Sequence, residues 1–327
     1  MSDSELINQW LKQEQWDRFP ENLYAPIGYT LDAGGKHLRP QLLIMAVRLF
    51  GCTIDDSVRS AALAVELFHN FTLLHDDVMD AAPIRRGRPT VHVRWNNNVA
   101  ILSGDQMMIE AYKRLQGVNR LQLPEVLTLF SQMASGVCEG QQLDMDLEAT
   151  PLHQLNTPDA INLYLQMIER KTAVLIAYAL RIGATIANAP DNDARALYDF
   201  GRAIGLAFQL RDDLLDVYGN PDTFGKQIGG DIAEGKKTYL LLSAYINGND
   251  TQRTELCDTL YNNSLTPTDK YNKVRTVYDQ LLIPDLTQQL IDRYTQDALN
   301  ALLQVDVPDS KKQPLRDLAA KMTQRLW

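Results

Sequence analysis

The sequence predicts an all-α protein, a large helical bundle that surrounds a central cavity. The first observation is that apolar residues recur at intervals of three and four, as on the buried stripe of a helix. Ala64, Leu67, Phe71, Leu74 and Val78 form one such stripe. The second is that no stretch shows a convincing alternation of period two, which would indicate strands. The third is that no linker interrupts the 327 residues, 45% of which are hydrophobic, so we expect a single domain over residues 1–327.

Composition excludes several classes of protein. The formal net charge of −9 argues against general nucleic-acid binding. No apolar run approaches the roughly 18–20 residues that span a bilayer, so we expect no membrane span. Residues 1–17 are polar and acidic, unlike a signal peptide. Cys52, Cys138 and Cys257 have no metal-site spacing, and we expect them to be reduced thiols of a cytoplasmic protein.

The first half of the chain reads as helices joined by polar turns. Residues 4–30 predict one or two amphipathic helices, with breaks at Pro20 and Pro26. The glycines at 34 and 35 indicate a turn into a helix that is apolar from 42 to 50. Helices are then predicted over residues 57–80, 101–116 and 123–147, and residues 81–90 read as a loop with three arginines.

The second half continues in the same way. Pro158 opens a helix that carries Lys171 and Thr172 within apolar residues, and another helix is predicted over 191–217. A glycine-rich loop follows over 224–238, and helical patterns return after Tyr239.

Three carboxylates lie at the end of the 57–80 helix. Asp76 and Asp80 are four residues apart, so they lie on nearly the same helix face, and Asp77 is beside them. Like charges so close repel, and a cation between them relieves the repulsion. Oxygen ligands of this kind suit Mg²⁺, which takes one or two carboxylates together with waters and substrate phosphates.

The same spacing recurs at Asp212, Asp213 and Asp216, again at the end of an apolar helical run. One copy is compatible with a solvated helix face, but two copies favour a shared function. Six carboxylates around one cavity need several cations and an anionic ligand to bridge them, and a diphosphate fits.

Basic residues near both motifs have two interpretations. Lys36 and Arg39 flank the start of a helix, where backbone N–H groups favour anions, although an ordinary loop explains them as well. Arg85, Arg86 and Arg88 either neutralise the aspartates or bind phosphate bidentately.

Several segments, in sequence order, resemble the trans-isoprenyl diphosphate synthases, also called the polyprenyl synthetase family. The resemblance covers about Tyr29 to Tyr239. It rests on GGKHLRP, FTLLHDDVMD, RRGRPT, the Lys171–Thr172 pair, FQLRDDLLD and GKQIGGDIAEGKKT. It implies the isoprenoid synthase type I fold and head-to-tail condensation of isopentenyl diphosphate with an allylic diphosphate (dimethylallyl, geranyl or farnesyl).

The resemblance also implies roles for residues. Asp76, Asp80 and Asp212 look like ligands of three Mg²⁺ ions that bridge the allylic diphosphate, with Asp77, Asp213, Asp216 and Asp231 as supporting or water-mediated ligands. The allylic diphosphate contacts look like Arg85, Lys171, Thr172, Gln209, Lys226 and Lys236. The isopentenyl diphosphate site looks like Lys36, Arg39, His69 and Arg86.

Product length and assembly follow from the same resemblance. A large aromatic residue at Phe71, five before the first aspartate, is similar to the short-chain synthases that make geranylgeranyl diphosphate, and Thr72 lies almost beneath Asp76. The growing tail needs an apolar tunnel, and a farnesyl product is an alternative because Tyr112 or Met108 on the neighbouring helix could raise the floor of that tunnel. A longer polyprenyl product is a second alternative. A homodimer is implied as well. A terpene cyclase or a non-catalytic synthase subunit fits less well, since both aspartate motifs are intact.

Overall fold

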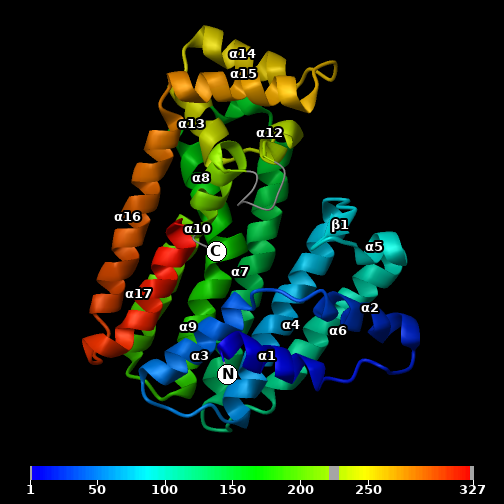
Figure 1. The fold of residues 1–327 in the computed structure, drawn as a ribbon, viewed down its shortest axis with the longest axis vertical. Coiled ribbons are helices and arrows are strands. Elements are labelled where there is room, and N and C mark those ends of the chain that lie inside the picture. Colours follow the sequence, from blue (N-terminus) through cyan, green and yellow to red (C-terminus); the bar gives the residue numbers. More distant parts are fainter. Residues whose placement is uncertain (1, 221–227, 325–327) are drawn as a thin grey trace. The chain divides into compact units, whose positions relative to one another are not determined.

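The computed structural model describes residues 2–220 and 228–324, and it confirms the all-α class (Figure 1). The chain divides into two compact units. Unit 1 comprises Met1–Ala134, Tyr178–Tyr198 and Val305–Lys311, and unit 2 comprises Ser135–Ala177, Asp199–Gln304 and Lys312–Trp327. The prediction of a single domain around one cavity stays a prediction. In the described part of the chain, no helix is long and apolar enough to cross a membrane.

Unit 1 is built around a long helix that carries the first aspartate motif. This helix, α4 (Asp56–Met79), begins at Asp55, whose side chain accepts a hydrogen bond from Val58 N, and it packs against α6 (Asn97–Leu115) and α3 (Leu38–Leu49). Nearly every position of α4 from Ala61 to Phe68 is buried, so the helix forms the centre of the core of unit 1. The other helices here are α1 (Asp3–Lys12), α2 (Glu21–Asp32) and α5 (Val91–Arg94).

Unit 2 has its own core, formed by the second aspartate helix and the helices that follow it. Leu206, Leu210 and Leu214 of α10 (Asp191–Tyr218) are buried with Tyr164 and Leu240 in this core. Its other elements are η1 (Leu152–Leu155), α8 (Pro158–Ile168), η2 (Glu169–Ala173), α12 (Gly230–Glu234), α13 (Tyr239–Asn247), α14 (Asp250–Leu260), α15 (Pro267–Gln280) and α16 (Ile283–Leu303). Helices α7 (Leu123–Ala149), α9 (Val174–Ile186), α10 and α17 (Asp309–Gln324) have residues in both units.

The predicted break at Pro26 is wrong. Pro20 caps the start of α2, but Pro26 lies inside this helix and is buried. A proline's fixed φ is compatible with helical backbone, and its cost comes from the missing N–H and a clash with the preceding turn. Packing of the ring against the core offsets that cost here.

The arginine loop contains a hairpin that periodicity could not reveal. Strands β1 (Ile84–Arg85) and β2 (Arg88–Pro89) pair antiparallel, with Arg85 opposite Arg88. The connecting residues, Arg86 (φ 51°) and Gly87 (φ 74°), are both left-handed, as a two-residue hairpin turn requires. Two-residue strands are too short to show an alternating pattern, and the turn places Arg86 at the tip.

The helix predicted from Pro158 is not uniform. It is α-helical to Ile168, becomes the π-helical turn η2 at Glu169–Ala173, and continues as α9. Lys171 and Thr172 both lie in η2. Single π-turns inside α-helices occur frequently at functional sites.

Candidate active site

The first aspartate motif lies at the C-terminal end of α4. Asp80 is the C-cap, and its N–H donates to the carbonyl of Asp76 at 2.8 Å, which places these two residues one turn apart, as predicted. Asp77 is only 5% exposed and accepts a hydrogen bond from Nε of Arg85 at 2.6 Å. Nη2 of Arg85 lies 3.9 Å from Oδ2 of Asp76.

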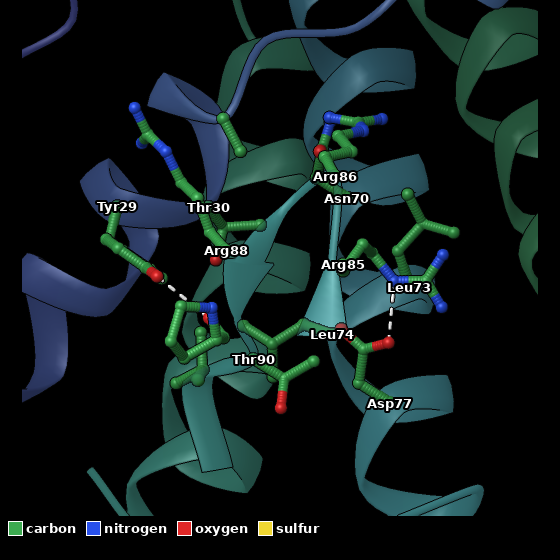
Figure 2. A pocket seen from close by; sticks show the side chains of 13 residues that line it. Tyr29, Thr30, Asn70, Leu73, Leu74, Asp77, Arg85, Arg86, Arg88 and Thr90 are labelled. Atoms are coloured by element: carbon green, nitrogen blue, oxygen red, sulfur yellow. Dashed lines mark hydrogen bonds and ion pairs between the residues drawn. The ribbon is translucent and has the colours of Figure 1, made fainter. Parts of the chain in front are cut away.

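Asp77 is therefore the buried residue of the motif, whereas Asp76 is partly exposed and Asp80 is exposed. Burial raises the pKa of this carboxyl, and the hydrogen-bonded Arg85 opposes the shift. The pair fixes Arg85 beside Asp76. A pocket of unit 1 adjoins the pair and is lined by Asn70, Leu73, Asp77, Arg85, Arg86 and other residues of α2 and the hairpin (Figure 2).

Three of the four residues predicted for the isopentenyl diphosphate site come together. Burial lowers the pKa of His69 well below its usual range, and nearby Arg39, Arg86 and Arg85 lower it further, so its imidazole is neutral. Burial also lowers the pKa of Arg86, and lowers that of Arg39 to about 10. These three side chains are thus close enough to influence one another's charge, and N–H donors of this kind suit an anion.

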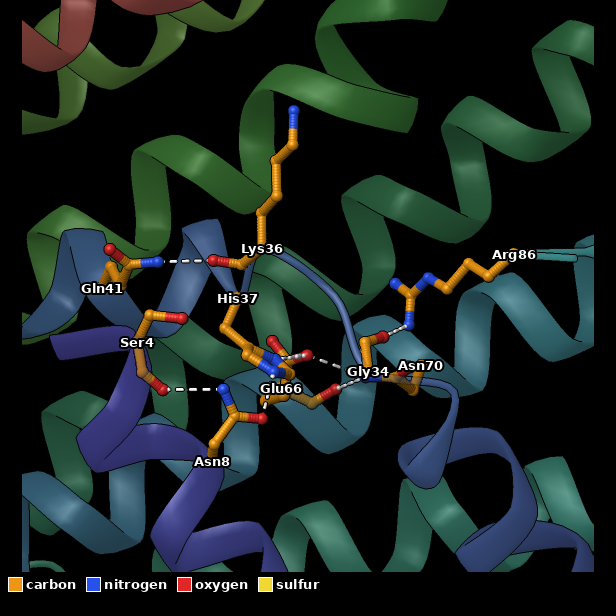
Figure 3. Close-up of polar contacts among 9 residues, drawn as sticks. All are labelled: Ser4, Asn8, Gly34, Lys36, His37, Gln41, Glu66, Asn70 and Arg86. Carbon is orange, nitrogen blue, oxygen red and sulfur yellow. Dashed lines mark hydrogen bonds and ion pairs between the residues drawn. The ribbon is translucent and has the colours of Figure 1, made fainter. Parts of the chain in front are cut away.

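The hairpin tip meets the glycine turn. Nη1 of Arg86 donates to the carbonyl of Gly34, and a Cβ on Gly35 would lie only 3.0 Å from Nη2 of the same arginine. The glycines therefore permit the close approach of Arg86. The fourth predicted residue, Lys36, is exposed and extends away from the buried contacts of this turn (Figure 3).

In unit 2, the π-turn η2 presents the Lys–Thr pair to two polar partners. Nζ of Lys171 lies 2.6 Å from Oδ2 of Asp144 on α7. The hydroxyl of Thr172 donates to Oε1 of Gln209 on α10 at 3.2 Å. The structure thus joins Thr172 to Gln209 on the helix of the second aspartate motif, and Lys171 to α7.

Asp213 is the buried member of the second motif. It is 3% exposed and accepts hydrogen bonds from Nε2 of Gln209 at 3.0 Å and from the hydroxyl of Tyr164. Burial raises the pKa of Asp213, and the same burial, with the carboxylate beside it, raises that of Tyr164. Asp213 orients Gln209, much as Asp77 orients Arg85.

Asp216 and Asp231, two of the predicted supporting Mg²⁺ ligands in unit 2, lie near each other. The carbonyl and Oδ2 of Asp216 accept hydrogen bonds from the N–H groups of Gly229 and Asp231, at 2.7 and 3.1 Å. Nζ of Lys236 lies 3.5 Å from Oδ1 of Asp231. Burial raises the pKa of Asp216 to about 6, and the negative charges of Asp231 and Asp212 contribute to the rise.

These carboxylates suit a Mg²⁺ ion that is bound together with the phosphates of a substrate. Among the described residues, no three His, Cys, Asp or Glu side chains are placed to surround one ion. Mg²⁺ rarely uses an all-protein cage and is held instead by one or two carboxylates with phosphate and water. The rise in the pKa of Asp216 from Asp231 and Asp212 shows that this group has excess negative charge that a cation would relieve.

Phe71, the predicted chain-length residue, belongs to a row of aromatic rings. It is 8% exposed, and its ring centroid lies 4.8 Å from that of His75 and 5.4 Å from that of Phe68. Phe68 contacts Phe130, which contacts Tyr112. The hydroxyl of Thr72 donates back to the carbonyl of His69 at 2.7 Å.

The predictions for Lys226 and for a contribution from Arg325 fall outside the described residues. Sequence reasoning also missed three partners of the predicted residues: Glu66, Asp144 and Tyr164. The sequence did contain an indication of Asp144, since this residue lies in the polar segment from Gly140 to Asp146 that ends an otherwise apolar helix. For Glu66 and Tyr164 it contained none, because a buried polar side chain looks like any other in the sequence.

The chain is similar to known proteins in sequence and in fold. The family model for polyprenyl synthetase matches residues 20–281. A geranylgeranyl diphosphate synthase of Methanosarcina mazei is 43% identical over 231 residues, which cover 70% of this chain and 69% of that protein.

Solved structures are similar over nearly the whole chain. A crystal structure of a geranylgeranyl pyrophosphate synthase superposes with a TM-score of 0.90 at 39% identity, covering 99% of each chain. The enzyme of Corynebacterium glutamicum, solved in complex with isoprenyl diphosphate and magnesium, has a TM-score of 0.86 at 29% identity and covers 98% of each chain.

Proposed function

Because this chain belongs to the polyprenyl synthetase family, we propose that it condenses isopentenyl diphosphate head-to-tail with an allylic diphosphate, mainly to geranylgeranyl diphosphate. The chain is a trans-prenyltransferase, in keeping with the family match and the similarity to geranylgeranyl diphosphate synthases. The observation that carries the proposed condensation is that each aspartate motif has one buried aspartate, which orients a polar side chain. Asp77 orients Arg85, and Asp213 orients Gln209.

The proposal includes a Mg²⁺ requirement, which the family and the magnesium complex of a structural relative support. Asp76, Asp80 and Asp212 are the proposed ligands of the ions, with Asp216 and Asp231 in support. When bound, Mg²⁺ supplies Lewis-acid stabilisation of the leaving diphosphate. Three ions are part of this proposal.

Cationic side chains bind and orient the allylic substrate. Lys171 is held by Asp144, Arg85 by Asp77 and Lys236 by Asp231, so each charge is fixed before the substrate arrives. Preorganised charges stabilise the negative charge that develops as the C–O bond ionises, without reorganisation during the reaction. Thr172 and Gln209 add hydrogen-bonding groups beside them.

Arg39, Arg86 and the neutral His69 hold isopentenyl diphosphate, with Lys36 as a further charge. Fixing its double bond next to the allylic cation supplies much of the acceleration. The new C–C bond forms there, and in this proposal the departed diphosphate takes the proton that the product loses.

An assay tests the proposal against its competitors. Purified protein with isopentenyl diphosphate, geranyl or farnesyl diphosphate and Mg²⁺ should yield a linear prenyl diphosphate and release inorganic diphosphate. Cyclic hydrocarbon from the allylic substrate alone would indicate a terpene cyclase. Turnover that requires a second polypeptide would indicate a synthase subunit.

Two further parts of the proposal concern the protein's state. We propose a homodimer, and light scattering that shows only a mass near 36.9 kDa would contradict it. Cytoplasmic location stays a prediction that the fractionation of cells expressing the tagged protein would test.

A further inference from the structure

Glu66 is a buried charge that none of the proposed steps uses. The residue lies on α4 and is 1% exposed. Oε1 lies 2.8 Å from Nδ1 of His37 and accepts from Nδ2 of Asn70 at 3.0 Å (Figure 3). Oε2 is buried as well, and no donor among the described residues hydrogen-bonds to it. Such a carboxylate is costly unless nearby positive charge compensates it.

His37 extends this contact to the N-terminal helix. Its Nε2 lies 3.0 Å from Oδ1 of Asn8 on α1, and the amide of Asn8 is oriented because Nδ2 donates to the carbonyl of Ser4 at 2.9 Å. Both ring nitrogens thus lie within hydrogen-bonding distance of an oxygen atom, one on Glu66 and one on Asn8. His37 also has a left-handed backbone (φ 47°) and is the N-cap of α3. It therefore stands between Lys36 and the first turn of α3, which contains Arg39.

The two arginines of the isopentenyl diphosphate site are close enough to Glu66 to be influenced by its charge. Its negative charge opposes the lowering of the pKa of both Arg39 and Arg86, whereas Arg86 contributes to the lowering at Arg39. Nε of Arg39 is buried without a hydrogen-bond partner among the described residues. Glu66 therefore compensates the charge of Arg39 without accepting a hydrogen bond from that N–H group.

We propose that Glu66 is a positioning residue for isopentenyl diphosphate, which it serves through Arg39, Arg86 and His37. One carboxylate compensates the charges of both arginines, and its hydrogen bond to His37, together with that of His37 to Asn8, fixes the turn from Gly34 to Arg39 against α4 and α1. This inference rests on the proposed function, because it assigns the substrate that these arginines bind.

The test replaces the charge and keeps the shape. Glu66→Gln should raise the KM for isopentenyl diphosphate, and its Kd in calorimetry, by about tenfold, the order of loss when an outer group that orients a ligand-binding residue is removed. The KM for the allylic diphosphate and kcat should stay within about twofold. An unchanged or lower KM for isopentenyl diphosphate would overturn the proposal, because the carboxylate would then only oppose the anion.

Asn8→Ala provides an independent variant, since it removes the outer hydrogen bond to His37, together with the bond from Asn8 to Ser4, and leaves Glu66 in place. It should raise the same KM by about threefold, and the double variant should be no worse than Glu66→Gln alone, because residues that act through one group are not additive. Additive effects, or equal changes in both KM values, would show a merely structural role.

Asp193→Asn is the matched control. Asp193 is another buried carboxylate of unit 1, 4% exposed, but its partner is the N–H of Asp306 at 3.0 Å. The control should lower thermal stability without changing either KM. Consumption of isopentenyl diphosphate by the wild-type protein tests the proposed function separately. The positioning role of Glu66 can therefore fail while the proposed function holds.

Discussion

Gly140 of α7 and Lys171 of η2 pack backbone against backbone. A Cβ built on Gly140 would lie 2.7 Å from Cα of Lys171, closer than real side chains come. On another side of the same turn, a Cβ on Gly205 of α10 would lie 2.6 Å from Cα of Ala173. The π-turn that carries Lys171 and Thr172 is therefore held between two helices that only glycine allows to come so close.

Gly140→Ala should reduce turnover more than stability alone explains. The added methyl must displace the backbone of Lys171, and a shift of a positioning group by a fraction of an ångström can cost about a hundredfold in rate. We expect overpacking to cost about 1–3 kcal/mol of unfolding free energy. Steady-state kinetics at a temperature where the variant is folded, together with chemical denaturation, measures both effects.

Gly136→Ala is the control for this prediction. It lies one turn earlier on α7, but its Cβ would meet only the methyl groups of Val174, at 3.1 Å and beyond. Because side-chain methyls can move, kcat should stay near that of the wild type. Equal losses of kcat in both alanine variants would contradict the role assigned to the Gly140 contact.

Both aspartate motifs should be essential. Asp76→Ala or Asp212→Ala should abolish turnover and leave the fold intact, because each removes a proposed Mg²⁺ ligand and relieves repulsion among neighbouring carboxylates. Circular dichroism and a diphosphate-release assay measure the two properties. If either variant kept more than about a tenth of the wild-type rate, equivalent to about 1.4 kcal/mol, the metal assignment would be wrong. Asp159→Ala, an exposed change in the first turn of α8, is the control.

His69 should make the protein less stable as the pH falls. Burial lowers the pKa of His69 well below the ordinary value of about 6.5, and Arg39, Arg86 and Arg85 deepen the shift. The unfolded chain therefore takes up a proton below about pH 6.5 that the folded protein does not. Stability from this group is present above that pH and is lost as the pH falls, by up to about 1.4 kcal/mol per pH unit.

His69→Gln removes this titration. The unfolding free energy of the variant should fall less than that of the wild type between about pH 7.5 and 5, so the difference between the two proteins narrows or reverses at low pH. Denaturation curves in metal-free buffer at several pH values measure it. Parallel pH profiles of the two proteins would show that His69 takes up its proton in the folded state too.

The sequence was sufficient for the helices and for most of the proposed ligands, but not for how those ligands are held. Helical periodicity depends on burial of one face, so it located α4 and α10 within a few residues. It could not distinguish a π-turn from an α-helix at Lys171, because both bury nearly the same residues. It could not show the hairpin at Arg86 either, since a two-residue strand has no period. Glu66 was invisible for a different reason: its role depends on Arg39, His37 and Arg86, which the fold brings to it from other segments.

Product length is the last property to test, and Phe71 is the residue on which it depends. On an ideal helix wheel Phe71 lies about 140° from Asp76, so geometry alone does not direct it to the growing chain. The structure adds that its ring packs against His75 and Phe68 and retains 8% exposure, whereas Phe68 is fully buried. We therefore predict that the ring of Phe71, and not that of Phe68, meets the growing chain.

Phe71→Ala should therefore shift the main product from geranylgeranyl diphosphate to longer chains, since removing the ring lengthens the space for the prenyl tail. Phe68→Ala is the matched control: it should lose a comparable amount of stability, about 3–5 kcal/mol, without lengthening the product. Chromatography of the dephosphorylated products, at a temperature where both variants are folded, separates the two outcomes. A wild-type product of hexaprenyl length or longer, or an unchanged product in Phe71→Ala, would remove Phe71 as the residue that limits the chain. Lengthening in Phe68→Ala as well would mean that general loosening of the aromatic row, and not the ring of Phe71, sets the product.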